Sequence, residues 1–333
     1  MPTRTLKIRT ILGLLVAAHA CALVSSQVLA ADTATTFPNR PVRMVAPFPP
    51  GGTADFLARL LTERVSRAWG QQVVVDNRSG AGGVIGTEIV AKASPDGYTL
   101  LMSAIGHAAN PALYEKLPYD TLRDFRPVTL VADVPLFIVV NPKLSVGSVK
   151  ELVALARARP GVLNFAAGGV GASSHWAGEL FRSAAKIEWG TLQYKGGGPA
   201  LVAVLGNEAQ LMFSPMPSSI ELVKAGRLRA IAVTSPRRAS LAPDVPTIAE
   251  AGVSSYEFQA WYGVLAPAGI STPVLRRLNS GFNAALEDPV VRAQMVAEGA
   301  EPLGGSAESF AEFMRSEVKK YAAVARSVGI GVK

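Results

Sequence analysis

Four times along this 333-residue chain, an apolar strand-like run breaks into a glycine-rich loop and restarts as a helix. A helix that starts in such a loop leaves its first backbone N–H groups without intrahelical partners, and its dipole favours negative charge there. Two loops lie early and two lie beyond residue 160, which predicts two lobes whose anion-binding loops face each other. The four loops span residues 47–53, 80–83, 168–174 and 195–198.

The alternation of strands and helices predicts βαβ units, and hence an α/β fold with mixed, mostly parallel sheets. Residues 42–46 are typical of a buried strand, and either Thr53 or Asp55 is expected to cap the helix that follows. Ser148 opens a capping box for a second helix, which should stop before Pro160.

Beyond residue 266 the pattern is mainly helical, so the tail is expected to pack back onto an existing lobe. The chain should therefore cross between lobes twice, near residues 134–140 and 258–265. This division predicts a first lobe of residues 31–135 plus 262–333 and a second lobe of residues 136–261.

The first 30 residues have the composition of a secretory signal peptide. Three basic residues precede an apolar run from residue 11 to residue 24, and small residues allow cleavage after Ala30. The apolar run is shorter than the roughly 20 residues of a membrane span. We therefore expect the protein to be exported. Lipidation at Cys21 is the alternative processing route that the sequence leaves open.

Composition narrows the function further. Cys21 is the only cysteine, so the exported chain can form no disulfide and no thiolate metal site. Without residues 1–30, 30 Lys and Arg remain against 25 Asp and Glu, a net charge of +5 that either favours small anions or only reflects a solvated surface. No basic run with interleaved aromatics is present, so nucleic acid is not expected as a partner.

Enzymatic motifs are incomplete in this sequence. The glycine loops lack the Gly-Lys-Ser/Thr of a P-loop, and loop 80–83 lacks the acidic residue of a dinucleotide site about 20 positions on. Gly-x-Ser-x-Gly is absent, and His107 and His175 are the only histidines after residue 30. Two histidines without a cysteine are too few ligands to predict a metal site. We expect no cofactor, no metal and no catalytic turnover.

Several polar residues at the loops are candidates for ligand binding. Ser173 and Ser174 stand at a helix start, where one is expected to cap the helix while both donate to an anion. Asp55 either provides a favourable charge in the first helical turn or accepts a ligand hydroxyl or ammonium. Tyr194 and Trp261 are wall or core aromatics, and a phenol at a strand end could also donate to a ligand.

The order of these motifs resembles the Bug family, the extracytoplasmic receptors of tripartite tricarboxylate transporters. The similarity runs from residue 37 to about residue 330. The segments that carry it are 37–43, 47–55, 77–83, 95–100, 110–114, 173–175, 194–196 and 244–252.

This resemblance implies a two-lobed periplasmic-binding-protein fold of the Venus flytrap type (type II). It also implies a periplasmic monomer that binds a di- or tricarboxylate, an aromatic acid or an amino acid in its cleft, and membrane permease subunits as partners. There are two alternative functions. The protein could be a ligand-sensing receptor for a sensor kinase, or an exported hydrolase that uses the same cleft. The ligand-binding residues that the resemblance and the loops suggest are Phe48, Gly51, Gly52, Thr53, Asp55, Gly171, Ser173, Ser174, Tyr194 and Ser214.

The chain departs from the family pattern near the expected cleft. Ser214 stands where many relatives carry Asp, residues 192–193 replace an apolar-Pro pair, and Trp176 replaces a common aliphatic residue. The ligand of a relative therefore cannot be transferred to this chain. The loss of an acid at position 214 makes an ammonium-bearing ligand less expected.

Overall fold

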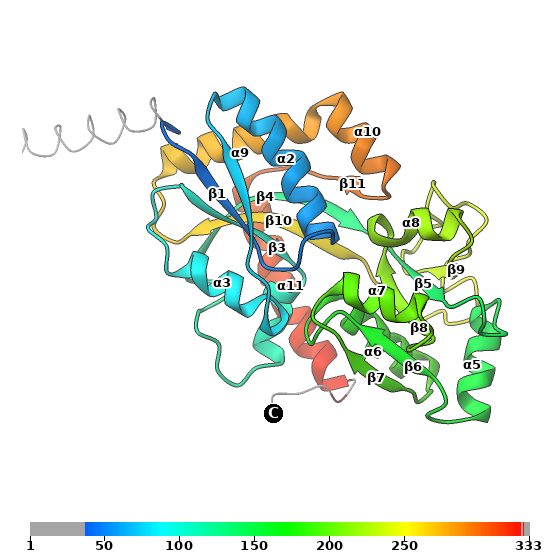
Figure 1. Ribbon diagram of the computed structural model, residues 1–333. Coiled ribbons are helices and arrows are strands. Elements are labelled where there is room, and N and C mark those ends of the chain that lie inside the picture. The colour runs from blue at the N-terminus through cyan, green and yellow to red at the C-terminus, as the bar shows by residue number, and fades with distance from the viewer. Residues whose placement is uncertain (1–36, 328, 330–333) are drawn as a thin grey trace, which may run out of the picture.

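The computed structural model describes residues 37–327 and residue 329 and shows two β-sheets, each flanked by helices (Figure 1). The first sheet has the strand order β11-β4-β10-β3-β1-β2, and the second has the order β7-β6-β8-β5-β9. The first-sheet strands are β1 (Val42–Ala46), β2 (Val73–Asn77), β3 (Thr99–Ala104), β4 (Phe125–Val134), β10 (Ala260–Pro267) and β11 (Glu301–Pro302). The second-sheet strands are β5 (Leu136–Val140), β6 (Asn164–Ala167), β7 (Gly190–Gln193), β8 (Leu211–Pro215) and β9 (Arg229–Val233).

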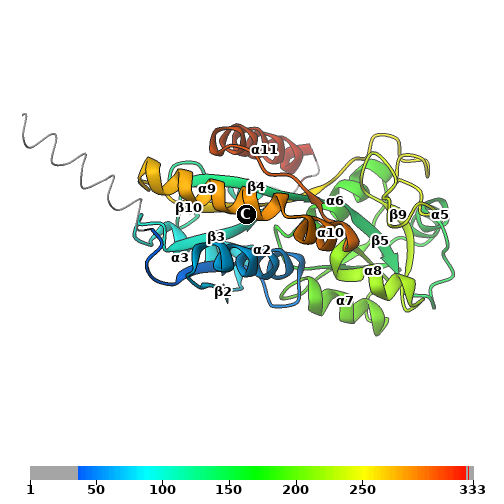
Figure 2. The same cartoon turned by 90° about the horizontal axis from the view of Figure 1, so that it is seen from above.

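We call each sheet with its helices a lobe. The first lobe holds α2 (Thr53–Trp69), η1 (Ala81–Gly83), α3 (Val84–Ala91), α4 (Gly106–Ala109), η2 (Asn110–Ala112), α9 (Thr272–Glu287), α10 (Pro289–Ala297) and α11 (Ala307–Ser327). The second lobe holds α5 (Val149–Ala158), α6 (Ser173–Ala185), α7 (Gly197–Leu205) and α8 (Met216–Lys224). Seen from above, the two lobes lie side by side, with α11 on the outer face of the first-lobe sheet (Figure 2).

The two-lobed α/β fold with mixed sheets is thus confirmed, but parallel pairs are not the majority. Parallel pairing joins β1 to β2 and β3, and β6 to β7 and β8. The other five strand pairs are antiparallel. The reason is the crossing between lobes: β10 enters the first sheet from the second lobe and runs antiparallel to both β3 and β4.

The chain passes between the two sheets at two places in its described part. Only Pro135 separates β4 from β5, and the chain returns through residues 234–259 into β10. A third link is made by packing: the Tyr321 ring of α11 lies 5.0 Å from the Trp176 ring of α6. The exact lobe boundaries given above stay a prediction.

Local sequence signals are realised in the helices. The Ser148 side chain accepts a hydrogen bond from the Glu151 N–H, which is the first half of a capping box. The Glu151 carboxylate reaches one residue further back than the motif predicts and accepts from the Gly147 N–H. Gly70 ends α2 in the left-handed conformation at φ 64°. The long strand β4 was not anticipated, because Pro127 and its irregular burial pattern hide the alternation of a strand.

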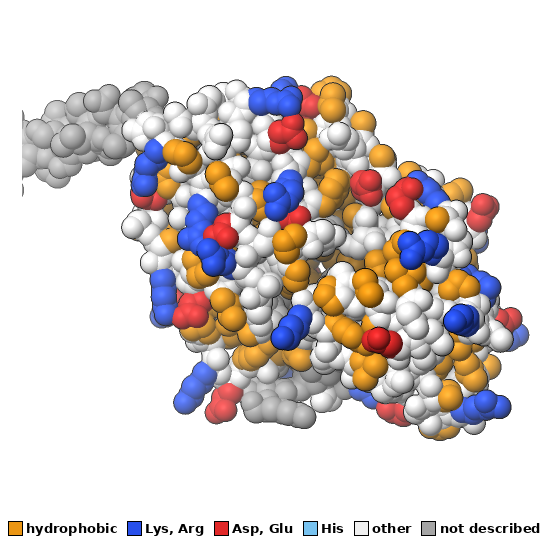
Figure 3. Space-filling view, in the orientation of Figure 1, with side chains coloured by type: hydrophobic (Ala, Val, Ile, Leu, Met, Phe, Trp, Pro, Cys, Tyr) orange, Lys and Arg blue, Asp and Glu red, His pale blue; other side chains and the backbone are white. Residues whose placement is uncertain are grey.

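The signal peptide, its cleavage site and Cys21 lie outside the described residues. Within the part that the structure describes, no helix combines the length and the apolar character needed to cross a membrane. In Figure 3, basic and acidic side chains are scattered over the visible face of the molecule.

Candidate ligand-binding site

A small cavity lies where the two lobes meet, with about 60 Å³ open to the centres of water molecules. Residues from both lobes line it. The lining residues are Phe48, Pro49, Gly52, Thr53, Ala54, Ala104, Gly168, Ala172, Ser173, Ser174, Gly197, Gly198, Met212, Pro215, Ser218 and Tyr262.

Four helices begin at this cavity. They are α2 from the first lobe and α6, α7 and α8 from the second, and each contributes first-turn residues or its N-cap to the lining. Within the described chain, none of the four N-cap residues makes a side-chain hydrogen bond to the start of its helix. The N–H groups of the first turn have no intrahelical partner, so those that are present and not bonded elsewhere remain available as donors. The start of α7 has one donor fewer, because Pro199 has no N–H. Because the helix dipoles add positive potential, the cavity suits an anion.

The expected side-chain caps were wrong, and the reason bears on the site. The N-cap of α2 is Gly52, which has no side chain to offer, so neither Thr53 nor Asp55 caps it. The N-cap of α6 is Ala172, and the Ser174 hydroxyl instead accepts a hydrogen bond from the Gly168 N–H at 2.8 Å. Both helix starts therefore keep their first N–H groups for a ligand.

The start of α8 offers fewer donors than the other three. The Met216 N–H donates to the Pro135 carbonyl at 3.1 Å, and Pro217 has no N–H. Ser218 is the α8 residue beyond these two that lines the cavity. Because Pro135 joins β4 to β5, the start of α8 is also fixed to a crossing between lobes.

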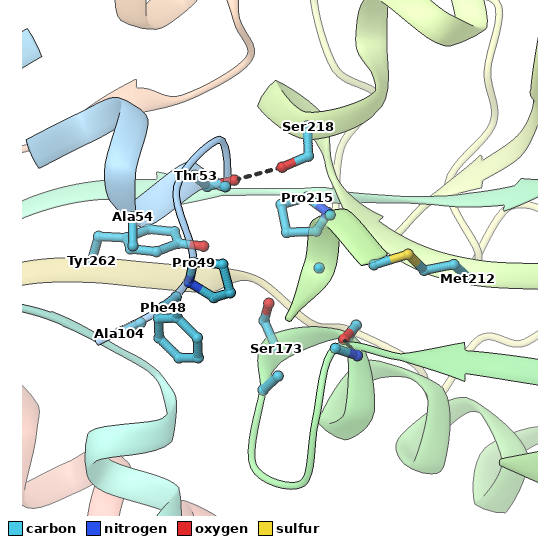
Figure 4. Close-up of a pocket in the computed structure, with 16 residues that line it drawn as sticks. Phe48, Pro49, Thr53, Ala54, Ala104, Ser173, Met212, Pro215, Ser218 and Tyr262 are labelled. Atoms are coloured by element: carbon cyan, nitrogen blue, oxygen red, sulfur yellow. Dashed lines mark hydrogen bonds between the residues drawn. The ribbon is translucent and has the colours of Figure 1, made fainter. Parts of the chain in front are cut away.

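Three hydroxyl groups from different elements converge in the cavity. Tyr262 of β10 is 5% exposed, and its phenol points into the space beside Thr53 (Figure 4). Burial raises the pKa of Tyr262 to about 12, although hydrogen bonding with Thr53 and Ser173 acts in the opposite direction. The phenol thus stays protonated at physiological pH and can donate a hydrogen bond.

The two lobes are in contact around the cavity. The Thr53 and Ser218 hydroxyl oxygens lie 3.2 Å apart and join α2 to α8 (Figure 4). At Gly82 a β-carbon would lie 2.2 Å from the Val170 carbonyl oxygen of the other lobe, and φ is +63°. Loop 80–83 is therefore not an anion cradle, because it does not line the cavity and presses instead on loop 168–174.

The structure brings half of the suggested residues together. Those that line the cavity are Phe48, Gly52, Thr53, Ser173 and Ser174. The other five suggested residues do not line the cavity and instead contact other parts of the protein. These are Gly51, Asp55, Gly171, Tyr194 and Ser214.

The Asp55 side chain holds the first glycine-rich loop, residues 47–53, in place. Its carboxylate accepts hydrogen bonds from Gly51 N–H, Arg59 and Asn77. Burial alone would raise the pKa of the Asp55 carboxyl, but the bonds from Arg59, Gly51 and Asn77 outweigh it and lower the pKa. The charge therefore shapes loop 47–53 and holds it against β2, where Asn77 ends the strand.

The remaining residues support the second-lobe loops. The Gly171 N–H donates to His175 Nδ1 at 3.4 Å, and at Gly171 a β-carbon would lie 2.5 Å from Asn110 Oδ1. Ser214 is fully buried and donates to the Pro215 carbonyl at 3.4 Å. Tyr194 packs on the smaller hydrophobic cluster of the second lobe.

Other lining residues were not anticipated as site residues. Gly197 and Gly198 belong to the fourth glycine loop, so the sequence did carry a signal for them. Met212, Ser218 and Tyr262 carry no such signal, because the packing of β8, α8 and β10 decides which of their side chains face the cleft. Trp261, the neighbour of Tyr262, points away and donates to the buried Glu317 at 2.8 Å.

The cavity wall is electrically neutral in its side chains. Among the described residues that line it, none is Asp, Glu, Lys, Arg or His. No group of three or more His, Cys, Asp or Glu side chains in the described chain is placed to hold a metal ion. The positive potential in the cavity therefore comes from helix starts and not from a basic side chain.

The fold and this cavity define a two-lobed solute-binding receptor. A family profile described as "Tripartite tricarboxylate transporter family receptor" matches residues 57–330, and the chain belongs to this family. It is 39% identical to Protein BugT of Bordetella pertussis over 313 residues, which is 93% of this chain and 96% of BugT.

Solved structures agree with this assignment. The chain is similar to "R. palustris Rpa4515 with adipate", with a TM-score of 0.87, 38% identity, and coverage of 89% of this chain and 100% of the other. It is also similar to "periplasmic binding protein BugD", with a TM-score of 0.86, 35% identity, and coverage of 89% and 100%.

Proposed function

We propose that this protein is a periplasmic receptor that captures a small organic carboxylate between its lobes and delivers it to the membrane permease of a tripartite tricarboxylate transporter. The observation that carries the proposal is the convergence of four helix starts, without side-chain caps, on one cavity with neutral side chains. N–H groups and hydroxyls there can replace the hydration of a carboxylate without a counter-ion.

The geometry supports capture by closure of the lobes. α2 belongs to one lobe and α6, α7 and α8 belong to the other, so a bound anion would satisfy donors on both sides at once. A ligand that contacts both lobes binds the closed form better than the open one and so shifts the population towards it. A permease that recognises the closed form would then distinguish loaded from empty receptor.

Two related structures support a carboxylate ligand and a periplasmic location. Rpa4515 was solved with adipate, a dicarboxylate, and BugD is described as a periplasmic binding protein. The signal peptide expected in residues 1–30 agrees with this location. A sensor kinase in place of the permease would use the same closure, and transport assays with the permease genes separate the two partners.

Hydrolysis at this site lacks support from the cavity. Ser173 and Ser174 line it, but the nearby His175 Nδ1 accepts the Gly171 N–H and His175 is not part of the wall. A serine nucleophile needs a base within hydrogen-bond reach. The described lining residues offer none.

The test is a thermal-shift screen of residues 31–333, unfolded and refolded first to remove any carried-over ligand. A carboxylate at 100 times its dissociation constant adds about 2.7 kcal/mol of stability. For lobes of this size, that is a shift in Tm of roughly 5–10 °C. The proposal predicts such a shift with one chemical series among mono-, di- and tricarboxylates and aromatic acids. A refolded protein that no carboxylate stabilises would contradict it.

A further inference from the structure

We propose that Trp176 and Tyr321 are positioning residues, which lower the affinity for the ligand from outside the cavity by disfavouring the arrangement in which the two lobes touch. This role rests on the proposed function, because it concerns the capture of a ligand between the lobes. Trp176 belongs to α6 of the second lobe and Tyr321 to α11 of the first. Neither residue lines the cavity.

The contact between Trp176 and Tyr321 moves with the lobes. The two ring centroids lie 5.0 Å apart, the ring planes are tilted by 57°, and both side chains are fully buried. Trp176 stands in the first turn of α6, and Ser173 and Ser174 of the same turn line the cavity. A rotation of the second lobe against the first therefore shifts Trp176 relative to Tyr321 and also moves the cavity wall.

Each of these two side chains buries a polar atom that has no hydrogen-bond partner in the described part of the chain. The atoms are Trp176 Nε1 and the Tyr321 hydroxyl oxygen. Burial raises the pKa of Tyr321 well above its ordinary value, so the hydroxyl keeps its proton and needs an acceptor. An indole N–H can only donate. Each group therefore pays a desolvation penalty that no hydrogen bond offsets.

This penalty depends on how the lobes are arranged, which distinguishes the pair from a similar atom elsewhere. Trp189 Nε1 is also buried without a partner in the described chain, but its ring stacks on Phe181 and packs against Phe165 within the second lobe. A movement between the lobes leaves Trp189 buried. Separation of Trp176 from Tyr321 would instead bring water to their polar atoms and remove the penalty.

The pair therefore opposes the bond between Thr53 and Ser218, which favours contact between the lobes. If the binding-competent arrangement is a minor population, the apparent affinity is reduced by that fraction. Removing one unpartnered polar atom from the pair should raise the fraction. Binding should then become tighter although no atom of the cavity wall has changed.

The distance between the lobes without a ligand is the first readout. Residues 31–333 contain no cysteine, so two introduced cysteines can carry a specific pair of spin labels. Glu63→Cys on α2 and Val202→Cys on α7 put the labels at exposed positions of the two lobes. Tyr321→Phe removes the hydroxyl and keeps the ring. Tyr119→Phe is the matched control, because that buried phenol packs on Phe125 within the first lobe.

We expect Tyr321→Phe to raise the ratio of the lobes-in-contact distance to longer distances at least threefold, and Tyr119→Phe to leave it unchanged. A purely structural role of the hydroxyl would change the stability of the variant but not this ratio. The same distribution in wild type and Tyr321→Phe, or a wild type that shows only the lobes-in-contact distance, would overturn the proposal.

Ligand affinity is the second readout, with adipate as the probe because a related structure was solved with it. Calorimetry should show adipate binding roughly 3- to 10-fold more tightly to Tyr321→Phe than to the wild type, and within twofold of the wild type to Tyr119→Phe. Equal or weaker binding to Tyr321→Phe would contradict the proposal. If neither adipate nor any other carboxylate binds, the receptor role is contradicted, and the spin-label distances still decide the role of Tyr321.

Discussion

Thr53 of α2 and Ser218 of α8 meet across the cleft with their hydroxyl oxygens 3.2 Å apart, and they are also part of the cavity wall. One hydrogen bond therefore joins the two lobes at the point where the ligand is expected. Such a pair stabilises the closed form directly and helps to set how far the receptor closes before the ligand arrives.

Removing this bond should weaken the closed form. A hydrogen bond of this kind contributes about 0.5–1.5 kcal/mol, so Ser218→Ala should lower ligand affinity roughly 3- to 10-fold. Small-angle scattering should show a larger radius of gyration for the unliganded variant. Ser219→Ala is the control, because that buried hydroxyl donates to Pro215 within its own lobe. Unchanged affinity and scattering in Ser218→Ala would show that the pair does not control closure.

Filling the cavity should abolish binding without unfolding the protein. Ser173→Leu adds two heavy atoms and a branch beside the start of α6, where only about 60 Å³ is open. Calorimetry should show at least 100-fold weaker binding, while Tm stays near that of the wild type. Ser183→Leu is the control on the same helix, because Ser183 is exposed on its far turn. If Ser173→Leu kept full affinity, the assignment of this wall to the ligand would be wrong.

The contact between α11 and α6 makes a prediction about stability. The Tyr321 hydroxyl is buried and has no hydrogen-bond partner in the described part of the chain. Tyr321→Phe should therefore be neutral or stabilise the fold by up to about 1 kcal/mol. Tyr256→Phe should cost about 1 kcal/mol, because the Tyr256 hydroxyl donates to the Ala177 carbonyl at 3.0 Å.

Denaturant unfolding measures this difference. The expected order of stability is Tyr321→Phe at or above the wild type, and Tyr256→Phe below it. The opposite order would show that the Tyr321 hydroxyl has a stabilising partner and would refute the account of this interface.

His107 should make the fold less stable in acid. Its Nε2 donates to the Thr121 carbonyl, and burial lowers its pKa to about 4. The unfolded chain takes up this proton near pH 6.5 and the folded chain does not, so stability falls as pH drops from about 6.5 towards 4. At pH 5 this one group should cost about 2 kcal/mol relative to pH 7.5.

His107→Gln provides the comparison, because glutamine can keep a donor but does not titrate in this range. Unfolding free energies at pH 7.5 and pH 5 should show the wild type losing about 2 kcal/mol more than the variant. Equal losses would mean that His107 becomes protonated in the folded protein.

Much of the fold could be predicted because local patterns are strong. The strand 42–46 and the capped start of α5 at Ser148 were found at their observed positions. The pairing directions were harder, because β10 joins the first sheet only after a long excursion through the second lobe. A local sequence pattern does not indicate between which two strands a returning segment will insert.

The residues of the candidate site were also predicted only in part. Thr53 and Ser173 were predicted because a helix that starts after glycine is visible in sequence. Tyr262 was missed, because its place in the cavity depends on the pairing of β10 with β3 and β4. The role of Asp55 was ambiguous in the sequence, because a carboxylate in the first helical turn can either face a ligand or hold its own loop in place. Its hydrogen bonds to Arg59 and Asn77 show the second role.

The most direct measurement of the central claim is a calorimetric titration of refolded residues 31–333 with linear dicarboxylates of four to eight carbons and with the matching diamides. Each diamide keeps the chain and removes the charge. If helix starts hold an anion, at least one dicarboxylate should bind at least 100-fold more tightly than its diamide, and Ser173→Leu should abolish that binding. Equal affinity for acid and diamide, or binding that survives in Ser173→Leu, would contradict the account.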